Sequence, residues 1–165
     1  MQYKEIIQEL ESLSDPMAVA GMQRFGIQTE NTYGVSIPHL RKMAKQIGRS
    51  HLLAQRLWAS GIHEARILAS MVDAPEVVTE EQMEGWAKDF DSWDICDQCC
   101  SNLFDKTKLA YRKAVEWSGR NEEFVKRAGF VLMAALAVHD KEMSDREFVN
   151  FFPLLGERLP MTETL

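Results

Sequence analysis

Apolar residues recur at helical spacing along most of the chain and predict a protein built from helices. Leu40, Met43 and Ile47 fall on one face of a predicted helix, and the following segments repeat this pattern. Short polar connections separate the segments, whereas the alternation typical of strands is nearly absent. We therefore expect an all-α fold of about ten helices.

Start and stop signals place these helices along the chain. Helix-start patterns occur at Asp15–Pro16, in the capping boxes Thr79–Gln82 and Ser144–Glu147, and at the simple caps Ser36, Ser50, Ser92 and Asn121. The predicted helices cover residues 3–13, 62–72, 80–89, 93–103, 107–118, 122–138 and 145–158, with three more that begin near Pro16, after Ser36 and after Ser50.

The order of these helices indicates stacked helix pairs. The pairs recur at roughly 30–40 residues, a spacing compatible with a HEAT-like helical-repeat solenoid. Residues 26–38 are rich in turn formers and predict the longest loop. Residues 128–138 are apolar on every face, so we expect a central helix that its neighbours cover on all sides.

The composition is that of an ordinary globular protein. Of the 165 residues, 45% are hydrophobic and 27% are charged, and we expect a single domain over residues 1–165. Residues 128–138 fall well short of the ~20 apolar residues that span a bilayer, and the first residues mix charges with apolar side chains instead of forming an export signal. We therefore expect no membrane association and a cytoplasmic location.

The net charge of −6 argues against indiscriminate binding of polyanions, but the charges are segregated along the chain. Residues 41–66 contain six basic residues and one acid, whereas residues 67–105 contain ten acids and one lysine. Residues 106–127 reverse the balance again, with seven basic residues and three acids. Folding can gather these two basic blocks on one face.

Residues 91–104 concentrate unusual side chains. On a helix, Trp93 and Asp97 lie along one face together with Cys100, so an indole is presented beside a carboxylate. The alternative is structural: Trp93 packs in the core or in a groove, and Asp94 and Asp97 are solvated acids favoured by the helix dipole. The residues that should point into the core are Ile95, Cys99 and Leu103.

The three cysteines, Cys96, Cys99 and Cys100, lie within five positions of one another. A redox C-x-x-C site would need a βαβ context, and a closed zinc site would need two further ligands at suitable spacing. Because the sequence provides neither, we expect reduced thiols that act as small core residues and no metal. The motifs of P-loop, dinucleotide-binding, serine-hydrolase and zinc-protease sites are absent as well.

Lys126 and Arg127 stand near the start of a predicted helix, where the helix dipole disfavours cations. Glu122 and Glu123 precede them by four residues, so two i,i+4 ion pairs are a sufficient structural explanation. The other explanation is that the basic pair binds phosphate. The sequence leaves both explanations open.

Four segments are informative in combination: YGVSIPHLRKMAK (33–45), HEARILAS (63–70), SWDICDQCCSNLF (92–104) and NEEFVKRAGFVLM (121–133). In this order they resemble the DNA alkylation repair, or AlkD-like, family over most of the chain. The resemblance implies an all-helical, HEAT-like fold whose concave, positively charged face holds duplex DNA. It also implies a monofunctional DNA glycosylase that hydrolyses the N-glycosidic bond of N3- and N7-alkylated purines without a metal or an organic cofactor.

The resemblance also suggests roles for individual residues. Its W-D-x-x-D segment places Trp93 and Asp97 at the damaged nucleotide. Asp97 would stabilise an oxocarbenium-like sugar and position a water, and Trp93 would contribute cation–π contact. Arg127 would contact the DNA backbone near the lesion. The further candidate contacts to the backbone are Lys126, Arg41, Lys42, Lys45, Lys106, Arg112 and Lys113.

Further expectations concern the molecule as a whole. The expected partner is duplex DNA with alkylated purines, bound by a monomer. Members of the family continue through further C-terminal helices that bring another aromatic residue to the site, so we expect that part of the site to be missing from a chain that ends at Leu165. The alternative function is a non-catalytic HEAT-like module that binds structured DNA or a protein partner.

Overall fold

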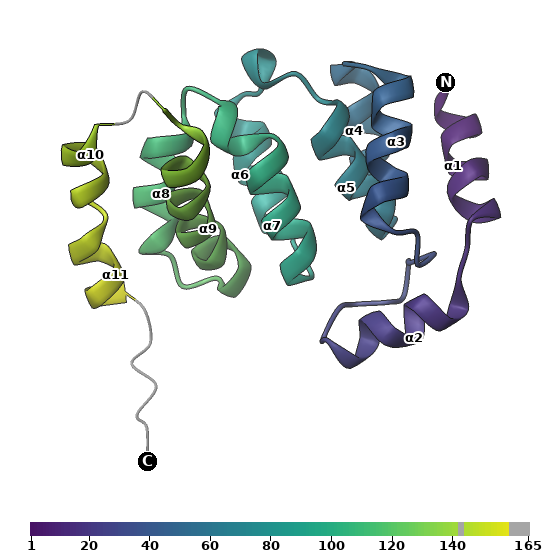
Figure 1. The fold of residues 1–165 in the computed structure, drawn as a ribbon, viewed down its shortest axis with the longest axis horizontal. Helices are drawn as coiled ribbons and strands as arrows, with labels where there is room; N and C mark the ends of the chain where they lie inside the picture. The colour runs from purple at the N-terminus through teal and green to yellow at the C-terminus, as the bar shows by residue number, and fades with distance from the viewer. Residues whose placement is uncertain (142–143, 159–165) are drawn as a thin grey trace.

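The computed structural model describes residues 1–141 and 144–158, and in these residues the chain forms helices and no strands (Figure 1). Eleven α-helices and two short 3-10 helices follow one another there, which confirms the predicted all-α fold. Among these helices, none is both long and apolar enough to cross a membrane. The elements are α1 (Tyr3–Ser12), α2 (Pro16–Arg24), α3 (Ile37–Ile47), α4 (His51–Ala59), α5 (His63–Val72), η1 (Pro75–Val77), α6 (Glu80–Lys88), α7 (Trp93–Asn102), η2 (Phe104–Lys106), α8 (Ala110–Ser118), α9 (Glu123–His139), α10 (Asp145–Val149) and α11 (Phe152–Arg158).

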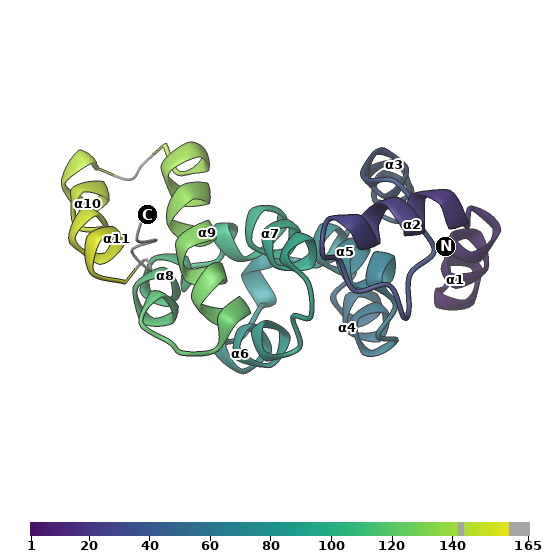
Figure 2. The same cartoon turned by 90° about the horizontal axis from the view of Figure 1, so that it is seen from below.

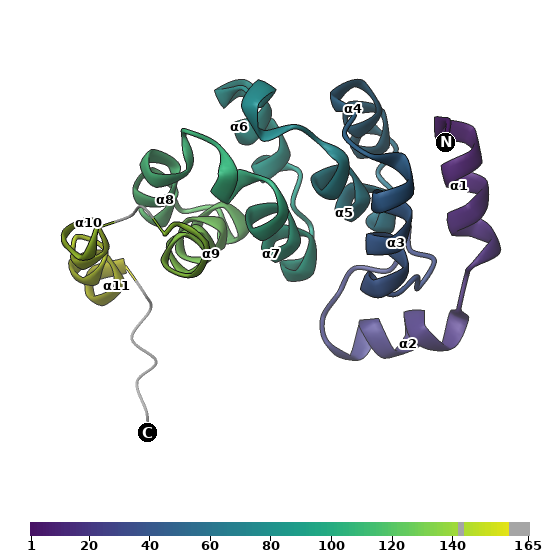
Figure 3. The ribbon, with the colours of Figure 1, turned by 45° about the horizontal axis from the view of Figure 1, so that its top comes forward.

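The helices form two layers along the molecule. α3, α5, α7 and α9 pack against one another in this order, and we call them the inner layer. Figure 2 shows α4, α6 and α8 on the opposite side, the outer layer, where α4 packs on α5 and α8 packs on α9. Figure 3 shows the helix pairs following one another in a curved row from α1 to α10 and α11. This is the stacked arrangement of a HEAT-like repeat fold.

The four inner helices run in the same direction, so their N-terminal ends lie along one edge of the molecule (Figure 1). Glu64 in the first turn of α5 accepts hydrogen bonds of 2.7–3.3 Å from the backbone N–H groups of residues 33–35, in the loop before α3. His63, the first residue of α5, bonds Asp94 in the first turn of α7 at 2.7 Å. These contacts join positions 29 to 31 residues apart, so each repeat is tied to the next.

Aromatic rings fill the space around α6. The rings of Trp58 and Trp86 stack with their centroids 4.0 Å apart. Phe104 of η2 lies 6.3 Å from the ring of Trp86 and 5.9 Å from that of Trp117, and both Phe104 and Trp117 are fully buried. Since such ring pairs add to the free energy gained by burial, the cluster holds η2 firmly at the end of α7.

The apolar stretch at 128–138 lies in α9, but its surroundings differ from the prediction. Leu132, Met133 and Leu136 are buried, whereas Ala134 and Val138 are exposed. The prediction that neighbours cover this helix on all sides is therefore wrong. α7 and α8 pack on adjacent sides of α9 and leave another side open.

The helix predicted over residues 145–158 is divided into α10 and α11. Pro153 explains the division, because its ring has no N–H to donate and would clash with the carbonyl of Val149 in a continuous helix. Phe151, between the two helices, is buried and stacks on Tyr111 of α8 with ring centroids 5.1 Å apart. This contact holds the last helix pair against α8.

Some of the predicted helix caps are confirmed and others are not. Ser36 and Ser92 occupy N-cap positions, but their hydroxyls bond neighbouring side chains instead of the backbone. The N-cap of α9 is Glu122 rather than Asn121. The side chains that accept from backbone N–H groups of the first turn, as predicted, are Asp15, Ser50, Thr79 and Ser144. Ser144 and Glu147 form the predicted capping box, whereas Gln82 bonds Asp73 and does not complete a box with Thr79.

Gly129 sets the distance between α8 and α9. A Cβ at Gly129 would lie 2.3 Å from the backbone N of Ser118 and 2.8 Å from the carbonyl carbon of Trp117. Because backbone atoms cannot move aside easily, we expect Gly129→Ala to lower the free energy of unfolding by about 3 kcal/mol, measured by urea denaturation. The matched control is Gly85→Ala in α6, where a Cβ would meet nothing within 4 Å and should stabilise the helix by about 1 kcal/mol. Similar effects of the two substitutions would contradict the close approach.

Candidate functional site

One side of α7 faces the open surface between α5 and α9. Trp93 and Asp97 lie on this side together with Ser101. Trp93 is 37% exposed, and the side chain of Asp97 is 32% exposed. The prediction that Cys100 shares this side is wrong, because α9 packs over Cys100 and buries it fully. The core positions predicted for α7 are confirmed by the burial of Ile95, Cys99 and Leu103.

All three cysteines are free and buried, as predicted. The thiols of Cys96 and Cys100 donate hydrogen bonds to the backbone carbonyls of Phe124 and Ala128 in α9. Burial raises the pKa values of the Cys99 and Cys100 thiols well above the usual range, so both stay protonated. In residues 1–141 and 144–158, no three His, Cys, Asp or Glu side chains are arranged to hold a metal ion.

Asp97 forms a two-point ion pair with Arg127 of α9. The Nε and Nη2 atoms of Arg127 donate hydrogen bonds of 2.8 Å to the two carboxylate oxygens. The hydrogen bond to Asp97 raises the pKa of Arg127, so the guanidinium stays charged. The ion-pair partner of Arg127 is therefore Asp97, and not Glu123 as the i,i+4 spacing suggested. Glu122 pairs with Arg120 instead of Lys126.

The indole of Trp93 completes this group. The guanidinium carbon of Arg127 lies 5.8 Å from the centre of the Trp93 ring, within the range of a cation–π contact. The Nε1 of Trp93 donates a hydrogen bond of 3.0 Å to the carbonyl of Phe25, at the end of α2. The fold therefore brings Trp93, Asp97 and Arg127 together, and we call these three residues the triad.

Asp94 has a structural role beside the triad. Its carboxylate accepts hydrogen bonds from the Ser92 hydroxyl at 2.6 Å and faces Nε2 of His63 at 2.7 Å. Burial opposes ionisation of Asp94, but the hydrogen bonds of His63 and Ser92 lower its pKa. The interpretation of Asp94 as a solvated acid is therefore wrong, and Asp94 instead joins α5 to α7.

An open groove of about 680 Å³ lies further along α7. Its wall includes Ser101, so it is continuous with the side of α7 that carries Asp97. The folded chain gathers residues of both basic blocks here. The positively charged and histidine residues that line this basic groove are Arg41, Lys45, Arg49, Lys106 and His139.

The remaining predicted contacts lie elsewhere. Lys42 is exposed on α3 and Lys126 is partly buried on α9, and neither lines the basic groove. Arg112 and Lys113 lie on α8, in the outer layer. The two basic blocks therefore meet on the inner layer only in part.

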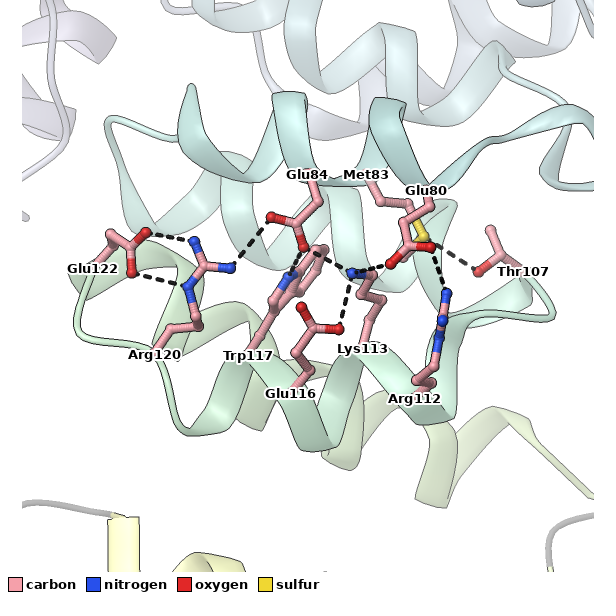
Figure 4. A network of polar contacts seen from close by, with 10 residues as sticks. All are labelled: Glu80, Met83, Glu84, Thr107, Arg112, Lys113, Glu116, Trp117, Arg120 and Glu122. Carbon is pink, nitrogen blue, oxygen red and sulfur yellow. Dashed lines mark hydrogen bonds and ion pairs between the residues drawn. The ribbon is translucent and has the colours of Figure 1, made fainter.

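Arg112 and Lys113 belong to a network of ion pairs between α6 and α8 (Figure 4). The ammonium of Lys113 contacts the carboxylates of Glu80, Glu84 and Glu116 at 2.7, 2.8 and 3.0 Å, and the side chain is 1% exposed. Arg112 pairs with Glu80 at 2.7 Å. Because a phosphate has no access to the ammonium of Lys113, the expectation that this residue contacts DNA is wrong.

Comparison with known proteins identifies the family. The family model described as DNA alkylation repair enzyme matches residues 6–162. The chain belongs to the DNA alkylation repair enzyme family. Comparison with curated proteins found no match.

One solved structure is similar to this DNA alkylation repair family member with a TM-score of 0.83 and 22% sequence identity. It is described as a new family of proteins related to the HEAT-like repeat DNA glycosylases with affinity for branched DNA structures. The match covers 94% of this chain and 66% of the other, so the chain spans just under two thirds of that relative's length. The likeness confirms the HEAT-like fold.

Some residues of the site were not predicted from the sequence. His63 and Glu64 hold the loop before α3 and the start of α7, and a signal for them exists: the pairs His63–Glu64 and Trp93–Asp94 stand 30 positions apart, each at the start of an inner helix. Arg49 and His139 line the basic groove. No local pattern marks these two residues, because only the fold brings the ends of α3 and α9 to one groove.

Glu84 makes the stability of the α6–α8 network depend on pH. Burial opposes its ionisation, but hydrogen bonds from Lys113 and Trp117 lower its pKa to about 2, below the ordinary 4.5. Ionised Glu84 therefore stabilises the folded state above about pH 4.5, and this contribution is lost as the pH falls toward about 2. We expect the Glu84→Gln variant to unfold at a lower urea concentration than the original protein near pH 7. The difference between the two urea midpoints should become smaller below about pH 4.5. A difference that does not change with pH would contradict this, and exposed Glu81→Gln is the control expected to have little effect.

Proposed function

We propose that this chain is a monofunctional DNA glycosylase that hydrolyses the N-glycosidic bond of N3- and N7-alkylated purines in duplex DNA. The observation that carries the proposal is the meeting of Trp93, Asp97 and Arg127 on one face, beside a basic groove, in a member of the DNA alkylation repair family. The proposal includes a monomer that acts in the cytoplasm and requires neither a metal nor an organic cofactor.

The DNA would lie across the inner layer with its phosphates along the basic groove. Arg41, Lys45 and Lys106 supply positive charge there, and each phosphate that they neutralise releases bound counterions. Lys42 and Lys126 lie on α3 and α9, which border this surface, and are additional candidate contacts. Arg112 lies on the outer layer and is not part of the proposed interface.

The triad suits the departure of an alkylated base. Alkylation of a ring nitrogen makes the purine cationic, so the base leaves readily with the electron pair of its bond to C1′. Positive charge then develops on the sugar, where the carboxylate of Asp97 and the indole face of Trp93 would stabilise it. A water forms the new bond to C1′ and loses its proton to Asp97.

Arg127 would have to release Asp97 for this chemistry. The two side chains are 42% and 32% exposed, so solvent and a ligand can reach the ion pair. A DNA phosphate also accepts two hydrogen bonds from a guanidinium, so it can compete with the carboxylate of Asp97 for Arg127. We propose that binding of the backbone draws Arg127 away and leaves Asp97 charged beside the sugar.

A non-catalytic module that binds structured DNA is the second candidate function. The solved relative is described as belonging to proteins with affinity for branched DNA structures, and Asp97 is paired with Arg127 in this chain. In this case the same face would hold the DNA while the ion pair stays intact. Release of an alkylated base from DNA distinguishes the two candidates, because only the glycosylase would release it.

The substitution Asp97→Asn tests the catalytic proposal. We expect it to slow release of N7-methylguanine and N3-methyladenine from methylated duplex DNA by at least about 100-fold, as loss of a transition-state charge contact typically does. Affinity for the duplex should be kept or rise, because no positive charge is removed and Arg127 loses the carboxylate with which a phosphate competes. The control is Asp91→Asn, an exposed carboxylate in the loop before α7, which should excise at the original rate.

Two outcomes would contradict catalysis by Asp97. Full excision by Asp97→Asn would exclude the proposed role of this carboxylate. Binding of DNA by the original chain without any release of base would favour the non-catalytic module instead. If the chain bound no DNA, the alternative of a protein partner would gain support.

A further inference from the structure

His139 occupies an unusual position at the end of the basic groove. It is the last residue of α9, its imidazole is 48% exposed, and its Nδ1 lies 2.5 Å from Oδ2 of Asp105. The carboxylate of Asp105 is fully buried. Because a carboxylate only accepts, Nδ1 carries the hydrogen, and Nε2 of the neutral ring is left as an acceptor.

The groups that face His139 favour an anion in the groove. Arg41 and Lys45 approach from α3 and Arg49 from the residues after it, and Lys106 comes from η2. Among the described residues that line the groove, none is an acid. The nearby acids are Asp105, whose buried carboxylate pairs with Lys106 at 3.0 Å as well as with His139, and Asp140 at the C-cap of α9.

Protonation would change Nε2 of His139 from a hydrogen-bond acceptor to a donor. A phosphodiester oxygen accepts hydrogen bonds, so it gains nothing from a neutral Nε2 that also accepts. A protonated ring donates from Nε2 and adds a positive charge, and such charge-assisted hydrogen bonds are the strong ones.

We propose that the basic groove binds a DNA backbone phosphate and that His139 strengthens this contact when it is protonated. The inference rests on the proposed DNA binding and adds a pH-dependent contact to it. Arg127 and His139 are 12 residues apart on α9, which is about 18 Å along the helix axis. Since base pairs lie about 3.4 Å apart, the two residues would contact phosphates several nucleotides apart.

Histidine is the side chain whose charge ordinarily changes between pH 5 and pH 8, so binding of duplex and of four-way branched DNA is compared near pH 6 and near pH 8. We expect the original chain to bind about tenfold more tightly near pH 6. Its affinity should also fall more steeply with salt there, by about 0.9 in the logarithmic slope for one added phosphate contact.

Three variants locate this effect. His139→Gln can still donate to Asp105 but cannot become charged, so it should bind like the original chain near pH 8 and lose the gain near pH 6. His139→Lys is charged at both pH values and should bind tightly at both. The matched control is His51→Gln: His51 also bonds a buried carboxylate, that of Asp73, but does not line the groove, so this variant should keep the pH dependence.

The outcomes separate this inference from the proposed function. DNA binding whose pH dependence is the same in His139→Gln and in the original chain would overturn the inference and leave the proposed function standing. Absence of DNA binding at both pH values would overturn the proposed DNA binding itself. Loss of the pH dependence in His51→Gln but not in His139→Gln would assign the effect to a histidine that does not line the groove and would also overturn the inference.

Discussion

Polar contacts near the N-terminal ends of the inner helices hold the site in place. His63 joins α5 to α7 through Asp94, and Arg127 joins α9 to α7 through Asp97. Each contact joins one repeat to the next. The contacts that align the repeats therefore also place the carboxylate of Asp97 and the guanidinium of Arg127 beside the indole of Trp93. Asp97 and Arg127 form the more exposed of the two pairs, with side chains 32% and 42% exposed against 4% and 16% for His63 and Asp94.

The separation of charge between the layers explains how an acidic protein can present a basic groove. On the outer layer, Lys113 is surrounded by glutamates, and Arg120 pairs with Glu84 and Glu122 (Figure 4). On the inner layer, the groove is lined by four cations and, among the described residues, by no acid. The net charge of −6 therefore says little about this face, because low-dielectric walls and local charge set the potential in a groove.

Periodicity and caps predicted most of the helices and the core positions of α7, because both depend on local spacing, but they did not predict the division of residues 145–158 into α10 and α11. They failed where the burial of a residue depends on the packing of another helix. Cys100 is buried only because α9 packs over it, and Val138 is exposed because α9 has an open side. The resemblance suggested Trp93, Asp97 and Arg127, and the fold brings them together. It could not separate Lys113 from Lys45, because two lysines in basic stretches look alike in the sequence. Only the fold shows that Lys113 is buried against glutamates of another helix.

The central claim is that DNA binds the face that carries the triad, and indole N–H resonances test it most directly. The Nε1–H of Trp93 donates to Phe25 on the inner side, whereas those of Trp58 and Trp117 donate to Asp89 and Glu84 on outer-layer helices. During titration with duplex DNA, the signal of Trp93 should shift while that of Trp117 stays in place. A shift of the Trp117 signal with an unchanged Trp93 signal would contradict the account.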